Sequence, residues 1–246
     1  MSSTSYRDQI YDKYATVQAP DWCNTGVGVD GGARAALRRF ADWLPADRNA
    51  RILDLGCGAG HLLSALKEAG YNDVLGVDGS PECVSIARIK GLHVEHADVR
   101  EFCRSVDHKF DVICLFDVIE HFHKSEALDI FRLIWTRLAP HGALVVQTPN
   151  AVSPWVGQYR YGDFTHEVVF TPECLKNVLG LCGFKGVAVR EVAPIVHGCK
   201  SALRWFAWNI LWLACAGWHL AESGNLCGGI YTKNMLARAI KNDGSI

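Results

Sequence analysis

Three glycines at alternate positions, Gly56, Gly58 and Gly60, lie in the stretch ILDLGCGAGHL, residues 52–62. A short apolar run precedes them and a helix-like pattern follows. A strand, a glycine turn and a helix N-terminus together present free backbone N–H groups and let a ligand lie close against the chain. The stretch therefore predicts a ligand site at this turn.

Two classes of ligand use such a turn. A dinucleotide site has the pattern G-x-G-x-x-G, whose third glycine allows the pyrophosphate to sit on the helix. His61 stands where that third glycine would be, so the dinucleotide pattern fails by one position. An NAD-type nucleotide-binding oxidoreductase is therefore kept only as the alternative enzyme class.

The second class of ligand enters by resemblance. The segment LDLGCGAG gives Asp54 and the three glycines in the D-x-G-x-G-x-G form of the class I S-adenosylmethionine-dependent methyltransferases, which the sequence resembles. The segments VLGVDGS, EHADV, FDVICLFDVIEH and LAPHGALVVQTPN follow in family order, so the resemblance covers roughly residues 50–195. It implies S-adenosylmethionine as cofactor and S-adenosylhomocysteine as its product, with the glycine turn holding the methionine and ribose portions.

The resemblance also implies which acidic residues hold this cofactor. Asp78 would accept hydrogen bonds from both ribose hydroxyls, and Asp98 would accept the adenine amine while Val99 offers its backbone N–H. Asp54 would support the loop or approach the cofactor's amino group, and Asp117 is a further contact. For Asp98 the alternative is a helix N-cap, and the two roles can coexist.

Acid–base residues follow the fourth predicted strand. Asp117, Glu120 and His121 stand at the carboxyl edge, where open α/β sheets hold their ligands. A histidine has a pKa near operating pH and could remove a hydroxyl proton as the methyl group arrives. The alternative for His121 is a structural hydrogen bond. His121, His123 and Glu120 could suggest a metal ion, but side chains at i and i+2 diverge on a helix, so we expect no metal.

A second polar cluster lies in YRYGDFTHEVVFTPECL, between the fifth strand and the next helix. It resembles D-x-T-H-x-x-x-F-T segments in the branch of the family that includes ubiquinone O-methyltransferases and enzymes of surface-glycan gene clusters. His166 is the second candidate base, and the predicted acceptor-binding residues are Glu120, Tyr159, Asp163 and Glu167. The alternative is a loop whose Asp and Thr bond only to local turns.

Short β-branched runs alternate with helical patterns along the segment that carries these residues. The alternation predicts parallel strands with crossover helices, an α/β doubly wound sheet. The resemblance implies seven strands, the last antiparallel, in a Rossmann-like methyltransferase fold. The expected divisions of this single domain, 1–246, are a helical cap at 1–49, a cofactor-binding core at 50–195, a helical insertion at 196–230 and a final strand at 231–241.

The insertion is rich in tryptophan and apolar on all sides. Four of the eight tryptophans of the chain are concentrated there, namely Trp205, Trp208, Trp212 and Trp218. The run is near the lower limit for a membrane-spanning helix. Residues 200–221, flanked by Lys200 and Arg204, could instead form an interfacial helix on a membrane, or a helix buried on the sheet or in a dimer interface.

Composition narrows the partners. The formal net charge is -1, from 25 basic and 26 acidic residues, and no dense basic run occurs, so we expect no nucleic-acid partner. The 10 cysteines include no C-x-x-C pair and indicate reduced thiols. The stretch MSSTSYRDQIYDKYA has no apolar signal region, which predicts a cytoplasmic location, with peripheral contact at the inner face of the membrane as an option.

These features together predict methyl transfer to oxygen. The expected acceptor is a small or lipid-linked hydroxyl compound, with a sugar or glycan intermediate placed ahead of a quinone precursor on the strength of the resemblance. A membrane-associated protein that binds the cofactor without catalysis is the remaining class. The sequence does not determine the oligomeric state.

Overall fold

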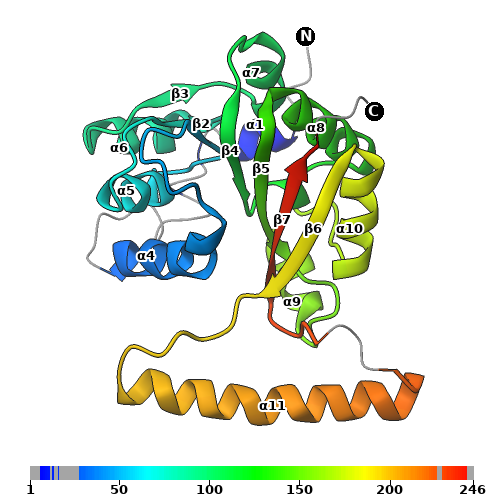
Figure 1. The fold of residues 1–246 in the computed structure, drawn as a ribbon. Coiled ribbons are helices and arrows are strands. Elements are labelled where there is room, and N and C mark those ends of the chain that lie inside the picture. The colour runs from blue at the N-terminus through cyan, green and yellow to red at the C-terminus, as the bar shows by residue number, and fades with distance from the viewer. Residues whose placement is uncertain (1–5, 12, 14–15, 17–27, 226–228, 243–246) are drawn as a thin grey trace.

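Seven strands form one sheet in the order β3-β2-β1-β4-β5-β7-β6, in a computed structural model that describes residues 6–11, 13, 16, 28–225 and 229–242 (Figure 1). The strands are β1 Ile52–Leu55, β2 Val74–Asp78, β3 Val94–His96, β4 Phe110–Phe116, β5 Leu138–Pro149, β6 Phe184–Glu191 and β7 Asn234–Lys241. Strands β1 to β5 are parallel, and β7 runs antiparallel to both β5 and β6. The predicted fold class is confirmed, with β7 starting three residues later than expected.

Helices cover both faces of this sheet (Figure 1). Helices α4, α5 and α6 pack on one face and α7, α8 and α10 on the other. The helical elements are α1 Tyr6–Tyr11, α4 Gly28–Phe40, η1 Ala41–Trp43, α5 His61–Glu68, α6 Pro81–Ile89, α7 Val99–Ser105, η2 Ile119–His121, α8 Lys124–Arg137, α9 Val156–Gly162, α10 Pro172–Leu181 and α11 Cys199–Ser223. The predicted cap at residues 1–49 lies partly outside the described residues.

The central strands are buried on both faces, which explains their continuous apolar runs. Along β4, Val112 and Cys114 pack toward α4, α5 and α6, whereas Ile113 and Leu115 pack toward α7, α8 and α10. All four side chains are at most 1% exposed. Successive side chains of a strand point to opposite faces, so one strand contributes to both cores.

The chain order reverses beside β1. From β1 the chain moves outward through β2 to β3, and then returns to β4 on the other side of β1. In open α/β sheets this switch point, at the carboxyl ends of the strands, is where ligands bind. The residues predicted to do chemistry follow β1, β2, β3 and β4, so the fold gathers them at this edge.

Helix α11 lies outside the two helical layers (Figure 1). It spans 25 residues, of which only Ser201 and Ala216 are buried. The alternative in which the insertion is buried on the sheet is therefore wrong, because the helix lies beyond the strand ends and most of its side chains are exposed. Within the described ranges, no helix combines the length and hydropathy needed to cross a bilayer.

Candidate active site

The glycine turn after β1 has a left-handed backbone at all three glycines. The φ angles are +72° at Gly56, +51° at Gly58 and +77° at Gly60, a region that favours glycine. A Cβ on Gly56 would lie 2.2 Å from Cγ2 of Val118, and a Cβ on Gly60 would lie 2.3 Å from Cδ1 of Leu92. A Cβ on Gly58 would meet nothing within 4 Å. The outer glycines therefore permit close packing, and the middle one leaves open space where a ligand can approach the backbone.

Asp78 ties this turn to the end of β2. Its Oδ2 accepts a hydrogen bond from the Gly58 N–H (2.7 Å), and its Oδ1 accepts one from the Ser80 N–H (2.8 Å). Withdrawal from water raises the pKa of Asp78, and the two backbone hydrogen bonds oppose that rise. A carboxylate has about four acceptor sites, so the predicted ribose contacts fit beside these two bonds.

Asp54 lies behind the turn, inside the sheet. It is 2% exposed and pairs with Gly76 on β2 and Cys114 on β4. Burial, together with the charge of Asp78, raises the pKa of Asp54 to about 7. Of its two predicted roles, this position favours support of the loop.

Asp98 and Val99 begin α7 at the end of β3. The Oδ1 of Asp98 accepts hydrogen bonds from the N–H groups of Arg100 (2.8 Å) and Glu101 (3.2 Å). The predicted N-cap role is therefore confirmed. Val99 is the first helical residue, so its N–H has no partner within the helix. The adenine contacts of both residues stay predictions.

Asp117 joins three strand ends. Its Oδ2 accepts a hydrogen bond from Nε2 of Gln147 on β5 (2.6 Å), and its Oδ1 accepts one from Nδ2 of Asn234 on β7 (2.9 Å). Withdrawal from water raises the pKa of its carboxyl, and the bond from Gln147 opposes the rise. Asp117 thus holds β4, β5 and β7 in register at the edge, and its predicted contact with the cofactor stays a prediction.

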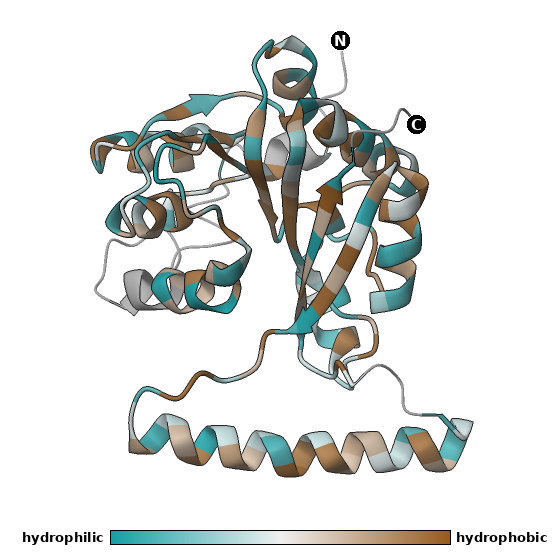
Figure 2. Cartoon of the chain, in the orientation of Figure 1, coloured by the Kyte–Doolittle hydropathy of each residue, from teal (hydrophilic) through white to brown (hydrophobic). Residues whose placement is uncertain are grey.

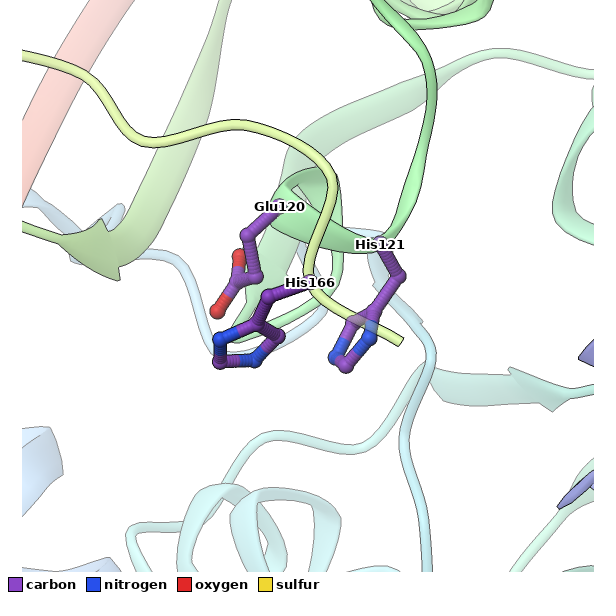
Figure 3. A group of neighbouring side chains, drawn as sticks. All are labelled: Glu120, His121 and His166. Atoms are coloured by element: carbon purple, nitrogen blue, oxygen red, sulfur yellow. The ribbon is translucent and has the colours of Figure 1, made fainter. Parts of the chain in front are cut away.

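Glu120, His121 and His166 converge beside this edge, as Figure 3 shows. Glu120 and His121 lie in η2, next to the Val118 side chain that packs on the glycine turn. His166 comes from the loop after α9, and its ring centroid lies 4.7 Å from that of His121. The backbone carbonyl of Glu120 accepts hydrogen bonds from the N–H groups of Glu167 (2.7 Å) and Val168 (3.1 Å), which fixes the loop on η2.

Hydrogen bonds determine which nitrogen of each neutral imidazole carries the proton. The Thr165 hydroxyl donates to Oδ1 of Asp163 (2.6 Å), so it accepts from Nδ1 of His121 (2.7 Å). The Nδ1 of His166 lies 2.6 Å from the carbonyl oxygen of Tyr159, which can only accept. Both neutral histidines therefore carry hydrogen on Nδ1 and keep a lone pair on Nε2.

Burial opposes the charged form of each ionisable group in this cluster. Burial, followed by the neighbouring His166, lowers the pKa of His121 to about 4. Burial and the charge of Asp117 raise the pKa of Glu120 well above its usual range, although Oγ1 of Thr148 donates to its Oε2 (3.1 Å). Burial also opposes ionisation of Asp163, but the two hydrogen bonds from Thr165 hold the pKa of Asp163 below its usual value. His121 is thus a neutral imidazole at physiological pH.

The two remaining predicted acceptor-binding residues lie around the cluster. Tyr159 contributes its carbonyl to His166, while Nζ of Lys233 lies 5.3 Å from the centroid of its ring. The Glu167 carboxylate accepts a hydrogen bond from the Tyr6 hydroxyl, and its Oε2 lies 3.4 Å from Nδ1 of His123. Their contacts with an acceptor stay predictions.

The cluster also contains donor atoms of the kinds that bind divalent metals. One such atom from each of Glu120, His121 and His166 lies within 4.8 Å of the others. The sequence offers His123 as the possible metal-binding partner of His121, but the structure brings His166 to His121 instead. The expectation that no metal binds here stays a prediction.

Sequence reasoning missed the residues that orient the cluster. Thr165 determines the tautomer of His121, and Thr148 donates to Glu120. Thr165 lies inside the D-x-T-H segment, so its place between an acid and a histidine was a usable signal. For Gln147 and Asn234, which hold Asp117, the sequence offers no such signal.

Comparison with known proteins identifies the family. A protein-family model described as a methyltransferase domain matches residues 29–189, which is more than half of the chain. The chain belongs to this methyltransferase family. Residues 29–189 are thus a class I S-adenosylmethionine-dependent methyltransferase domain, and the oxidoreductase alternative is wrong.

Individual relatives are distant. A tRNA U34 carboxymethyltransferase of Cellvibrio japonicus is 26% identical over 210 residues, 79% of this chain and 64% of that protein. A ubiquinone biosynthesis O-methyltransferase of Xanthomonas campestris pv. campestris is 32% identical over 158 residues, 61% of this chain and 64% of that protein. The chain thus spans about 64% of the length of each of these relatives.

A solved structure of an S-adenosylmethionine-dependent methyltransferase from Archaeoglobus fulgidus has the same fold. Its TM-score is 0.65 at 22% identity, covering 96% of this chain and 100% of that one. The open space at Gly58 and the acceptor sites left on Asp78 fit this family's cofactor.

Proposed function

We propose that the protein transfers the methyl group of S-adenosylmethionine to a hydroxyl oxygen. The observation that carries the proposal is the pair of imidazoles, His121 and His166, whose Nδ1 atoms are held by Thr165 and Tyr159. The bound cofactor supplies an electrophilic methyl group on sulfur. A hydroxyl attacking it in line must lose its proton, and a neutral imidazole nitrogen can accept that proton.

Within this pair we assign the role of proton acceptor to His166. It is half-buried, whereas His121 is 6% exposed and has a pKa of about 4, too low for an effective base near neutral pH. The bound cofactor would supply the methyl group and leave as neutral S-adenosylhomocysteine, and Nε2 of His166 would accept the proton of the attacking hydroxyl. His121 stays neutral and fixes the position of the His166 ring, with Glu120, Tyr159, Asp163 and Glu167 lining the acceptor side.

We propose a small or lipid-linked hydroxyl acceptor. The relatives named as ubiquinone biosynthesis O-methyltransferases support transfer to oxygen. The exposed apolar helix α11 beyond the same sheet edge supports an acceptor with an apolar portion. We place a sugar or glycan intermediate ahead of a quinone precursor, as the D-x-T-H segment suggests.

The test is a methyl-transfer assay in which purified protein and labelled S-adenosylmethionine are added to extracts of cells that lack the protein. We expect label in an ether linkage on a small or lipid-extractable product. Transfer to nitrogen or to added tRNA would contradict the proposal. Calorimetric binding of S-adenosylhomocysteine without label in any fraction would point to the non-catalytic binding protein.

The same assay tests whether a metal takes part. A divalent ion held by Glu120, His121 and His166 would be an alternative way to activate a hydroxyl, and those three groups have suitable donor atoms. We expect turnover to survive dialysis against a chelator. Loss of turnover that is restored by one added divalent ion would replace the base mechanism with a metal-assisted one.

A further inference from the structure

Helix α11 carries much of the exposed apolar surface of the described chain. The described residues include 15 large apolar side chains that are exposed, and eight of these lie on α11. They are Leu203, Trp205, Phe206, Ile210, Leu211, Leu213, Trp218 and Leu220, each 47–73% exposed. Figure 2 shows apolar residues spaced along the whole helix. Such a concentration marks a surface that another molecule covers.

One half of the helix surface already has contacts. At about 100° per residue, Ser201, Trp208, Trp212 and Ala216 fall on the same half. The Nε1 of Trp212 donates to the carbonyl oxygen of Gly229 (2.6 Å), on the segment that returns to β7. Ser201 and Ala216 are the two buried residues of the helix. This inner half holds α11 against its own domain.

The opposite half is apolar and faces away from those contacts. Leu203, Phe206, Ile210, Leu213 and Trp218 define this outer face of α11, and they are 54–73% exposed. We infer that the outer face of α11 is a docking surface for an anionic lipid bilayer. The inference goes beyond the proposed function, because docking does not depend on which atom receives the methyl group.

Charge favours a bilayer with acidic head groups. Lys200 and Arg204 are exposed in the first turns of α11, and Glu222 in its last turn is the only acidic residue of the helix. Basic side chains beside an apolar face with tryptophan are the composition of helices that lie in the membrane interface. The remainder of the face carries no charge that would have to be desolvated.

The width of the outer face favours lipid over a second copy of the chain. From Leu220 round to Leu211 the apolar arc covers about 180° of the helix, whereas a helix packed on protein typically buries a stripe of about 100°. One partner helix would leave part of the arc in water. A bilayer interface can surround half of a helix that is about 37 Å long.

The position of α11 directs the candidate active site toward the same surface. Strand β6 runs parallel to β5, since β7 is antiparallel to both, and α11 follows the carboxyl end of β6. Helix α9 lies at this end as well (Figure 1). Trp155 at its start and Tyr161 within it are 67% and 80% exposed. Tryptophan and tyrosine favour the boundary between lipid and water. A docked protein would therefore face the bilayer with the edge that holds His166.

Flotation with vesicles tests the inference. Wild-type protein should float with vesicles of equimolar phosphatidylcholine and phosphatidylglycerol, and Phe206→Glu with Leu213→Glu should reduce the bound fraction about tenfold or more. The matched control carries Ile89→Glu with Leu181→Glu, two side chains that are 86% and 65% exposed elsewhere, and should float like wild type. A second variant, Lys200→Glu with Arg204→Glu, should also lose binding to these vesicles.

Calorimetric binding of S-adenosylhomocysteine to every variant separates loss of docking from loss of the fold or of the cofactor site. Failure of the wild type to float would overturn the inference, and so would equal flotation of the outer-face variant. A wild-type dimer in sedimentation that the outer-face variant converts to a monomer, with no flotation of either, would assign the face to a second copy of the chain.

Discussion

The active-site edge and α11 depart from ordinary burial in opposite directions. At the edge, ionisable groups are buried, with Asp54 and Glu120 at 2% and 1% exposure. On α11, large apolar groups are exposed, with Leu203 and Trp218 at 70% and 73%. Proteins normally expose the first kind and bury the second. Both regions therefore lower the stability of the fold, which indicates that each serves another purpose.

The two departures point to different partners. Buried Glu120 and His121 have hydrogen bonds from Thr148 and Thr165 that fix their geometry, as expected of groups that must be aligned with a reacting atom. The exposed side chains of α11 have no such fixed geometry to maintain. An apolar surface that makes no directional hydrogen bonds suits a fluid partner such as a lipid bilayer. The hydrogen-bonded cluster at the sheet edge suits a single small molecule.

The largest expected effect is at the edge. Replacing His166 by alanine should lower kcat by about 10²–10⁴, because the hydroxyl proton would lose its proposed acceptor. Affinity for S-adenosylhomocysteine should be unchanged, since the glycine turn is a separate segment. His121→Ala should lower kcat less, as expected of a positioning residue.

His93→Ala is the matched control in these kinetics. The His93 side chain is exposed and lies just before β3, away from the converging pair, so kcat of this variant should stay near that of the wild type. A smaller loss for His166→Ala than for His121→Ala would reverse the roles assigned to the two histidines.

The second effect separates the two halves of α11. Trp212→Ala removes a hydrogen bond to Gly229 and a ring contact with Tyr231 (centroids 5.9 Å apart), so the free energy of unfolding should fall by about 2 kcal/mol or more. Phe206→Ala, at a side chain that is 60% exposed, should change it by less than about 0.5 kcal/mol. Urea melts in the absence of lipid measure both. Equal losses would mean that the outer face is packed after all.

The third effect concerns the cofactor. Asp78→Ala should weaken S-adenosylhomocysteine binding about tenfold or more, or 1.4 kcal/mol, because the predicted ribose acceptor and the bond to the Gly58 N–H are lost together. Calorimetry measures the affinity, with the exposed Asp107→Ala as the control. An unchanged affinity in a folded variant would move the ribose contact elsewhere.

The smallest effect is a pH dependence of stability. Burial raises the pKa of Asp54 from 3.8 to about 7, so the native state binds an extra proton between these values and loses stability as pH rises through that range. Asp54→Asn removes this loss. The stability of the variant relative to wild type should grow by on the order of 1 kcal/mol per pH unit between about pH 5 and 7, and level off above. Urea melts at several pH values check it, and a difference independent of pH would place the ionised carboxylate in a solvated site.

Local patterns in the sequence predict the sheet and its helix starts. Ser80, Asp98 and Thr171 each accept a hydrogen bond from the backbone at the start of a helix, as their types and positions indicate. His121 and His166 could be singled out because each follows a recognisable segment. Their contact could not be predicted, because it depends on how the loop after α9 folds onto η2.

The orientation of α11 was equally hidden. Trp208 and Trp212 are the most conspicuous residues of the insertion, yet Trp212 is bonded to the domain while Phe206 and Leu213 face outward. A helix that is apolar all round has no pattern from which its inner side can be read. That side is determined by the return segment at Gly229 and Tyr231, whose path is a tertiary property.

The strand order determines when the sheet can be completed during synthesis. Strand β6 bonds only to β7 among the described strands, and β7 must enter between β5 and β6. Because α11 precedes β7 in the chain, the ribosome makes the whole apolar helix before the residue pair Asp117–Asn234 can form. Strand β6 can therefore join the sheet only after all of α11 has been made, so the helix must find its place against the domain while β5 and β6 are still unbridged.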